Sequence, residues 1–202
     1  MRRLPVYLLL DTSGSMYGEP IEAVRNGVQV LVSTLRQDPY ALETAYLSII
    51  TFDSSAKQVT PLTELSSFQE PSIDANGCTV LGEALSLLAN CVDREVTKTT
   101  ADVKGDWKPL VFIMTDGVPT DDLTKGLNEF KKRLFMVIIA VYTLRNFRMD
   151  YFSNPNFLRS NVNAAFGECL TAVTVCCADF IGRIRVDGYV FPRKEAVELS
   201  VI

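Results

Sequence analysis

The chain has 202 residues, of which 48% are hydrophobic, and its 20 basic and 24 acidic residues give a net charge of −4. This length and composition predict one soluble globular domain, and no apolar segment reaches the ~18 residues of a membrane span. The sequence contains no histidine. Nucleophiles that need an imidazole base and zinc sites with histidine ligands are therefore excluded. The acidic balance also argues against a nucleic-acid partner.

Five cysteines are scattered along the chain without a CxxC motif. An odd, scattered set does not form a disulfide framework, so we expect reduced thiols and a cytoplasmic protein. The first residues, MRRLPVYLLL, resemble a weak signal peptide, but Pro5 and Asp11 interrupt and end the apolar run. We interpret this run as a buried first strand instead.

The first half of the predicted elements alternates between apolar strands and an amphipathic helix. Pro5–Leu10 has the continuous apolar pattern of a strand buried on both faces. Pro20–Arg36 carries one apolar stripe with a proline in its first turn, which predicts a helix that ends before Asp38-Pro39. Thr44–Phe52 is β-branched and aromatic, and Ala56–Thr60 is its expected hairpin partner.

The second half repeats the alternation after Pro61–Asn76, a segment that we interpret as a loop. The further elements are a helix over Val80–Val96, a strand over Lys108–Thr115, a helix from the Asp121-Asp122 cap to Lys132, and a strand over Leu134–Tyr142. This order predicts an α/β fold with a doubly wound, mainly parallel sheet covered by helices on both faces. Beyond it, Arg145–Asn163 has no clear periodicity, and Leu170–Ile184 suits either a helix or a strand.

Oxygen-bearing side chains follow the strands of this predicted sheet. Asp11, Ser13 and Ser15 come after the first strand, Thr79 opens the second long helix, and Asp116 follows the Lys108–Thr115 strand. Ligands of doubly wound sheets bind at this edge, and carboxylates with hydroxyls suit a hard divalent cation. We expect one such ion, with Mg²⁺ favoured and Mn²⁺ or Ca²⁺ as alternatives. Turn formation by the Asp11–Ser15 segment and helix capping by Thr79 are the competing explanations.

Together these five residues resemble the metal-ion-dependent adhesion site (MIDAS) of von Willebrand factor A (vWA) domains. That family uses Asp-x-Ser-x-Ser, a loop threonine and a later aspartate, and the match covers Asp11, Ser13, Ser15, Thr79 and Asp116. The resemblance implies that the serines and the threonine bind the ion directly or through water, and that the second aspartate acts through water. It also implies that a protein partner supplies a carboxylate that completes the coordination.

The chain is also similar to the bacterial tellurite-resistance TerY-like family within the vWA domains. The stretches that carry this similarity include RRLPVYLLLDTSGSM, LRQDPYALETAYLSIITFDSSAKQV and GDWKPLVFIMTDGVPTDD. The resemblance implies a cytoplasmic role in tellurite or chemical-stress resistance, with a protein kinase and a protein phosphatase of the 2C type as partners. We assign residues 1–142 to the vWA domain. Residues 143–202 lack the family's usual ending and are a divergent, recombined or frame-shifted part expected to complete the same domain.

Two other functions compete with protein binding as explanations of this residue set. A Mg²⁺-dependent phosphohydrolase with Asp11 as nucleophile would need a second carboxylate two residues later, where the sequence has Ser13. The chain also lacks a phosphate-binding Gly-rich loop and a general base near the site, so we expect no enzymatic activity. A scaffold with a purely structural ion is the third possibility, and an exchangeable ion would distinguish docking from it.

Overall fold

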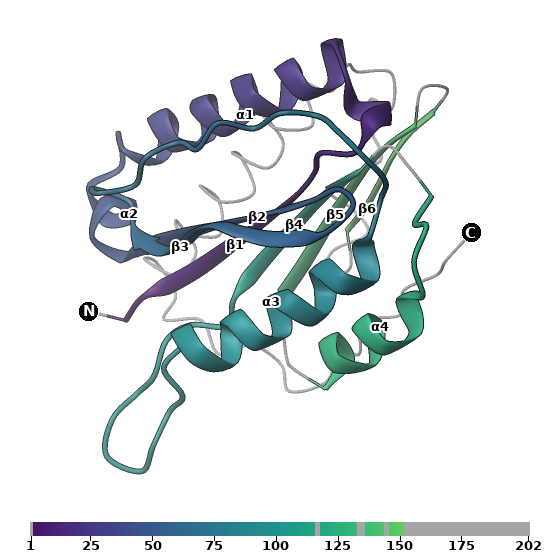
Figure 1. The fold of residues 1–202 in the computed structure, drawn as a ribbon. Coiled ribbons are helices and arrows are strands. Elements are labelled where there is room, and N and C mark those ends of the chain that lie inside the picture. The colour runs from purple at the N-terminus through teal and green to yellow at the C-terminus, as the bar shows by residue number, and fades with distance from the viewer. Residues whose placement is uncertain (1, 116–117, 133–135, 144–145, 152–202) are drawn as a thin grey trace.

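The computed structural model describes residues 2–115, 118–132, 136–143 and 146–151. Within these residues a sheet separates two layers of helices, with α1 and α2 on one face and α3 and α4 on the other (Figure 1). The elements are β1 (Leu4–Asp11), η1 (Gly14–Met16), α1 (Glu19–Leu35), α2 (Pro39–Thr44), β2 (Ala45–Phe52), β3 (Ala56–Glu64), α3 (Leu81–Glu95), β4 (Leu110–Thr115), α4 (Leu123–Lys131), β5 (Met136–Thr143) and β6 (Asn146–Tyr151).

The sheet formed by the described strands has the order β3-β2-β1-β4-β5-β6. Its central strands β2, β1, β4 and β5 run parallel, whereas β3 and β6 pair antiparallel at the two edges. The register aligns Asp11 of β1 with Phe52 of β2, and Leu10 with Met114 of β4. The carboxyl ends of these strands therefore meet at one edge, and the predicted doubly wound α/β fold is confirmed.

Alternate residues of the central strands enter two separate hydrophobic cores. In β1, Leu8 and Leu10 belong to the core under α1, while Tyr7 and Leu9 belong to the core under α3. Every residue of β1 and of β4 is buried, as the continuous apolar runs predict. Fully burying one such aliphatic side chain contributes about 1.5–3 kcal/mol, so this strand pair anchors the sheet against both helical layers.

The structure corrects two predictions around β2. A short helix, α2, begins at Pro39, shortly after α1 ends at Leu35, where no element was expected. Asp38 caps it by accepting hydrogen bonds from the backbone N–H groups of Tyr40 and Ala41. The Pro61–Asn76 segment is not wholly loop, because β3 continues through Pro61 to Glu64. A proline is tolerated there since β3 is an edge strand, whose outer N–H groups need no ladder partner.

The predicted strand over Leu134–Tyr142 is found as β5, with bounds of Met136–Thr143, and a third difference lies after it. β6 pairs with β5 from Asn146 to Tyr151, within the segment that showed no clear periodicity. Residues 152–202 lie outside the described part of the chain, and so does the undecided Leu170–Ile184 segment. None of the helices described has the length and hydrophobicity that crossing a bilayer requires.

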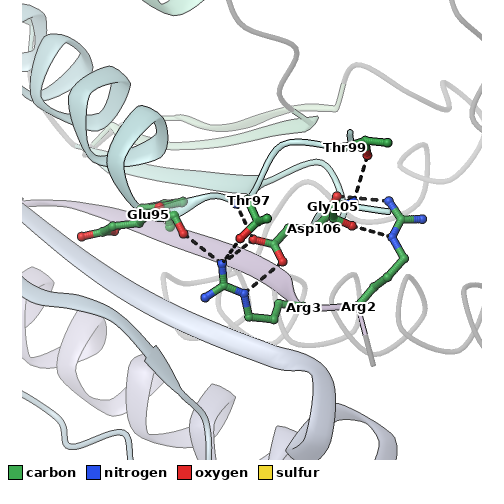
Figure 2. Close-up of polar contacts among 8 residues, drawn as sticks. Arg2, Arg3, Glu95, Thr97, Thr99, Gly105 and Asp106 are labelled. Atoms are coloured by element: carbon green, nitrogen blue, oxygen red, sulfur yellow. Dashed lines mark hydrogen bonds and ion pairs between the residues drawn. The ribbon is translucent and has the colours of Figure 1, made fainter. Parts of the chain in front are cut away.

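A cluster of hydrogen-bonded charged side chains lies at the amino ends of the parallel strands, opposite the edge that carries Asp11 (Figure 2). The Asp106 carboxylate accepts hydrogen bonds from Arg3 Nε at 2.9 Å, from Arg3 Nη2 at 2.6 Å and from the Thr97 N–H at 2.7 Å. Arg2 donates to the Gly105 carbonyl at 2.8 Å, and its guanidinium lies 3.8 Å from the centroid of the Trp107 ring. These contacts join the start of β1 to both ends of the loop between α3 and β4.

Asp106→Asn is expected to lower the free energy of unfolding by about 1–2 kcal/mol, because it weakens charge-assisted hydrogen bonds made by a carboxylate whose side chain is only 6% exposed. Urea unfolding followed by circular dichroism measures this loss. Asp102→Asn, at an exposed position of the same loop, is the control and should change stability by less than about 0.5 kcal/mol. Equal losses of stability in the two variants would contradict a stabilising role for the hydrogen bonds of Asp106.

Candidate metal-binding site

The Asp11 carboxylate lies at the carboxyl end of β1 and is 0% exposed. Its Oδ1 accepts a hydrogen bond from the Ser13 N–H at 2.8 Å, and its Oδ2 accepts one from Thr115 Oγ1 at 2.5 Å. These bonds come from the next turn of the chain and from the end of the neighbouring strand β4. They fix the orientation of the carboxylate, and because a carboxylate has about four acceptor positions, they are compatible with cation binding.

The two serines of the predicted set lie together in the turn that follows Asp11. Ser13 is 2% exposed, and its Oγ is 3.0 Å from Ser15 Oγ. The short helix η1 produces this arrangement, because the Met16 N–H donates to the Ser13 carbonyl and the Tyr17 N–H donates to the Gly14 carbonyl. The structure thus brings two hydroxyl oxygens and one carboxylate into a single compact turn.

A second loop, residues 76–79, is tied to this turn by backbone hydrogen bonds. The Asn76 N–H donates to the Thr12 carbonyl at 2.7 Å, and the Gly14 N–H donates to the Gly77 carbonyl at 2.9 Å. Gly77 has a φ of +77°, and a Cβ at this position would lie 2.3 Å from Ser54 Oγ. A side chain here would be strained by the positive φ and would displace the Ser54 hydroxyl, so glycine is favoured in the loop that leads to Thr79.

Thr79 is 5% exposed and lies just before α3. The predicted alternative that Thr79 caps this helix is wrong, because the N-cap residue is Val80 and no side chain of the cap position accepts a hydrogen bond. The Asp121 carboxylate takes that role instead, accepting from the N–H groups of Gly82 and Glu83. Thr79 is held by its backbone, whose carbonyl accepts from the Thr120 N–H at 2.8 Å.

Asp116 lies outside the described residues, so its predicted place among the ligands stays a prediction. The preceding residue, Thr115, is 4% exposed and hydrogen-bonds the Asp11 carboxylate. This role of Thr115 was not expected from the sequence, where the threonine appears only as the end of a strand. The contact follows from the strand order, because the parallel pairing of β1 and β4 brings Thr115 beside Asp11.

The described donors form a set of hard oxygen atoms. Asp11, Ser13, Ser15 and Thr79 supply one carboxylate and three hydroxyls on two loops that are hydrogen-bonded to each other. Such donors fit Mg²⁺ or a similar hard cation and do not fit a soft metal. Among the described residues, no group of three or more His, Cys, Asp or Glu side chains gathers to hold a metal. A cation at this edge would therefore depend on hydroxyls and water as well as carboxylates.

Two further residues, Cys78 and Thr12, lie in the two loops at this edge. Cys78 is an exposed free thiol whose N–H donates to Ser54 Oγ at 3.2 Å. Thr12 Oγ1 is buried and forms no hydrogen bond with any described residue. A buried hydroxyl of this kind is a place where an ordered water is expected, next to the Asp11 carboxylate along the chain.

Comparison with known families finds one that covers most of the chain. A model of the von Willebrand factor type A domain matches residues 6–156. Comparison with curated proteins found no match.

Solved structures show the same fold at low sequence identity. A von Willebrand factor type A protein from Catenulispora acidiphila is 17% identical with a TM-score of 0.56, over 86% of this chain and 42% of that one. Proximal thread matrix protein 1 from the mussel byssus is 17% identical with a TM-score of 0.52, over 69% of this chain and 38% of that one. The chain thus spans less than half of either structure, and these similarities show the fold alone.

Proposed function

Because this chain belongs to the von Willebrand factor type A domain family, we propose that it is a non-catalytic protein-binding module whose binding depends on a divalent cation. Domains of this family generally act as metal-dependent protein-interaction modules. The proposal for this chain adds the residues that would hold the ion, the chemistry of the partner and the cellular role.

The observation that carries the proposal is the buried Asp11 carboxylate beside a pair of serine hydroxyls. Ser13 Oγ and Ser15 Oγ are 3.0 Å apart, and the Ser13 N–H donates to Asp11 Oδ1 at 2.8 Å. A carboxylate that is 0% exposed is costly to desolvate, so a structure that keeps one needs compensating donors or a bound cation. The hydroxyl of Thr115 and the N–H of Ser13 are two such donors, and a bound cation would stabilise the buried charge further.

In this proposal Asp11, Ser13, Ser15, Thr79 and Asp116 hold one divalent cation, with Mg²⁺ favoured over Mn²⁺ or Ca²⁺. The ion would supply a positive charge with a coordination position open to an outside carboxylate, since Mg²⁺ keeps several exchangeable ligands in proteins. The side chains of this chain orient the ion and neutralise part of its charge. A partner's Asp or Glu then docks at the edge of the sheet where β1, β2 and β4 end.

The similarity to the TerY-like proteins supports a finer proposal about the cellular role. We place this module in the cytoplasm, in bacterial tellurite or chemical-stress resistance. A protein kinase and a protein phosphatase of the 2C type are its proposed partners. We propose no nucleic-acid or membrane partner, in keeping with the net charge of −4. We further propose that the chain is not an enzyme, because Ser13 occupies the position where an aspartyl phosphohydrolase would need an acid/base.

Capture of the two proposed partner enzymes tests this function. The immobilised chain is incubated with each purified enzyme in Mg²⁺ or in EDTA, beside an Asp11→Asn variant. We expect capture in Mg²⁺ that is lost both in EDTA and in the variant. Capture that persists in EDTA would contradict cation-dependent docking. Hydrolysis of a generic phosphoester that is abolished by Asp11→Asn would contradict the non-catalytic assignment.

A further inference from the structure

An open hollow of about 280 Å³ lies beside the candidate metal-binding turn. Its apolar lining includes Tyr17, Ile21 and Ala75, so it is bounded by the start of α1 and by the loop that leads to residue 76. Tyr17 comes two residues after Ser15 and is 81% exposed. Among the large hydrophobic residues of the described part of the chain, only Val118 exposes a greater fraction of its surface.

The rim of the hollow carries charged side chains that form ion pairs with one another. The Arg25 guanidinium donates to the Ile73 carbonyl at 2.7 Å, to Asp74 Oδ1 at 2.7 Å and to Glu22 Oε1. The side chains of Glu22 and Asp74 are nevertheless 58% and 78% exposed, so each keeps carboxylate surface toward solvent. The two carboxylates, Glu22 and Asp74, thus share one guanidinium, which leaves the rim with a local charge of −1.

Acidic residues in the first turn of α1 already have a structural reason, because they complement the helix dipole. Their charge alone therefore indicates no ligand. The helix dipole does not explain the exposed Tyr17 ring or the hollow that it helps to line. An aromatic face beside carboxylates fits a cationic side chain, whose aliphatic stem covers apolar surface while its charged head remains at the rim.

We propose that this hollow receives a lysine or arginine side chain of the same partner segment that places its carboxylate on the bound cation. This inference rests on the proposed function and adds a second requirement to the partner. The stem of the basic side chain would lie along Tyr17 and Ile21, and its charged group would meet Glu22 and Asp74. The recognised segment therefore contains an acidic residue with a basic residue a few positions away.

Charge complementarity favours a basic occupant over the two alternatives. A second acidic side chain would be repelled by the net negative rim. A purely apolar side chain would cover part of the Glu22 and Asp74 carboxylates without offering them a hydrogen-bond donor, which costs desolvation energy. A basic side chain satisfies the apolar lining and the charged rim together.

An array of synthetic peptides tests this inference. Each peptide has a Gly/Ser backbone, one glutamate at a fixed position and each amino acid in turn at the flanking positions, and binding is measured in Mg²⁺ and in EDTA. We expect lysine and arginine to be preferred at one offset from the glutamate. That preference should fall about fivefold in Glu22→Gln/Asp74→Asn and in Tyr17→Ser. The control variant Glu43→Gln/Glu64→Gln removes the same charge from exposed positions at the other end of the sheet and should leave the preference intact.

The possible outcomes separate this inference from the proposed function. Mg²⁺- and glutamate-dependent binding without a basic preference overturns the hollow's role and leaves cation-dependent docking standing. A preference for aromatic or aliphatic residues at that offset also overturns it, as does a basic preference that survives in Glu22→Gln/Asp74→Asn. Absence of any Mg²⁺-dependent peptide binding contradicts the docking function, and this inference with it.

Discussion

Asp11→Asn is expected to lower the affinity of the chain for Mg²⁺ at least about 100-fold while leaving the fold intact. The asparagine side chain has the same shape, and its remaining oxygen can still accept the hydrogen bond that Ser13 N–H donates to Asp11 Oδ1. The substitution removes the negative charge of a carboxylate that is 0% exposed at the end of β1. Calorimetric titration measures the affinity, and circular dichroism confirms folding.

Asp53→Asn is the matched control for this substitution. Asp53 follows β2 at the same edge of the sheet, and its Oδ1 accepts a hydrogen bond from the Ser55 N–H at 3.1 Å. The Asp53→Asn substitution removes an equal charge at this edge but leaves the proposed ligands in place, so the affinity for Mg²⁺ should change less than about threefold. If the Asp11→Asn variant bound Mg²⁺ as tightly as the Asp53→Asn variant, Asp11 would not be a ligand.

Gly126→Ala is expected to lower the free energy of unfolding by about 2–3 kcal/mol. In an exposed helix interior the same change stabilises a protein by about 0.5–1 kcal/mol, so here the expected sign is reversed. The reason is the close contact between α3 and α4, where a Cβ on Gly126 would lie 2.2 Å from the Gly82 carbonyl oxygen. Backbone meets backbone at this point, so the clash is relieved only if α4 moves away from α3.

Urea unfolding of Gly126→Ala beside Lys125→Ala measures this effect. Lys125 is an exposed residue of the same helix, and its substitution should change stability by less than about 0.5 kcal/mol. A stabilised Gly126→Ala protein would show that the two helices are farther apart than the structure has them. The Thr120 N–H to Thr79 carbonyl bond joins the segments that lead into these helices, so the displacement would also reach the loop that carries Thr79.

The strands and long helices could be predicted because their signals are local and strong. β1 and β4 are continuous apolar runs that are buried throughout, and α1 and α3 each carry one apolar stripe. α2 was missed because it has only 6 residues, too few to display a helical period. β3 was cut short at Pro61 because a proline ends most strands, and only the sheet order shows that β3 is an edge where proline is allowed.

In the candidate site, too, the local features could be predicted from the sequence and the long-range contacts could not. The sequence predicted the residues of the Asp11–Ser15 turn, which the structure brings together. It did not predict the contacts made across long sequence separations, such as Thr115 Oγ1 to Asp11 Oδ2 or Asp121 to the start of α3. Local patterns name the residue types suited to a cation, whereas the pairing of distant segments decides which neighbours support them. The alternative that Thr79 caps α3 is wrong for this reason, whereas its role as a metal ligand stays a prediction.

Calorimetric titration of the EDTA-treated chain with Mg²⁺, and then with Mn²⁺ and Ca²⁺, tests the central claim most directly. We expect saturable binding of one ion that chelation reverses and that Asp11→Asn removes. A folded chain that binds none of the three cations would contradict a metal site at the carboxyl edge of this sheet, and so would binding that Asp11→Asn leaves unchanged.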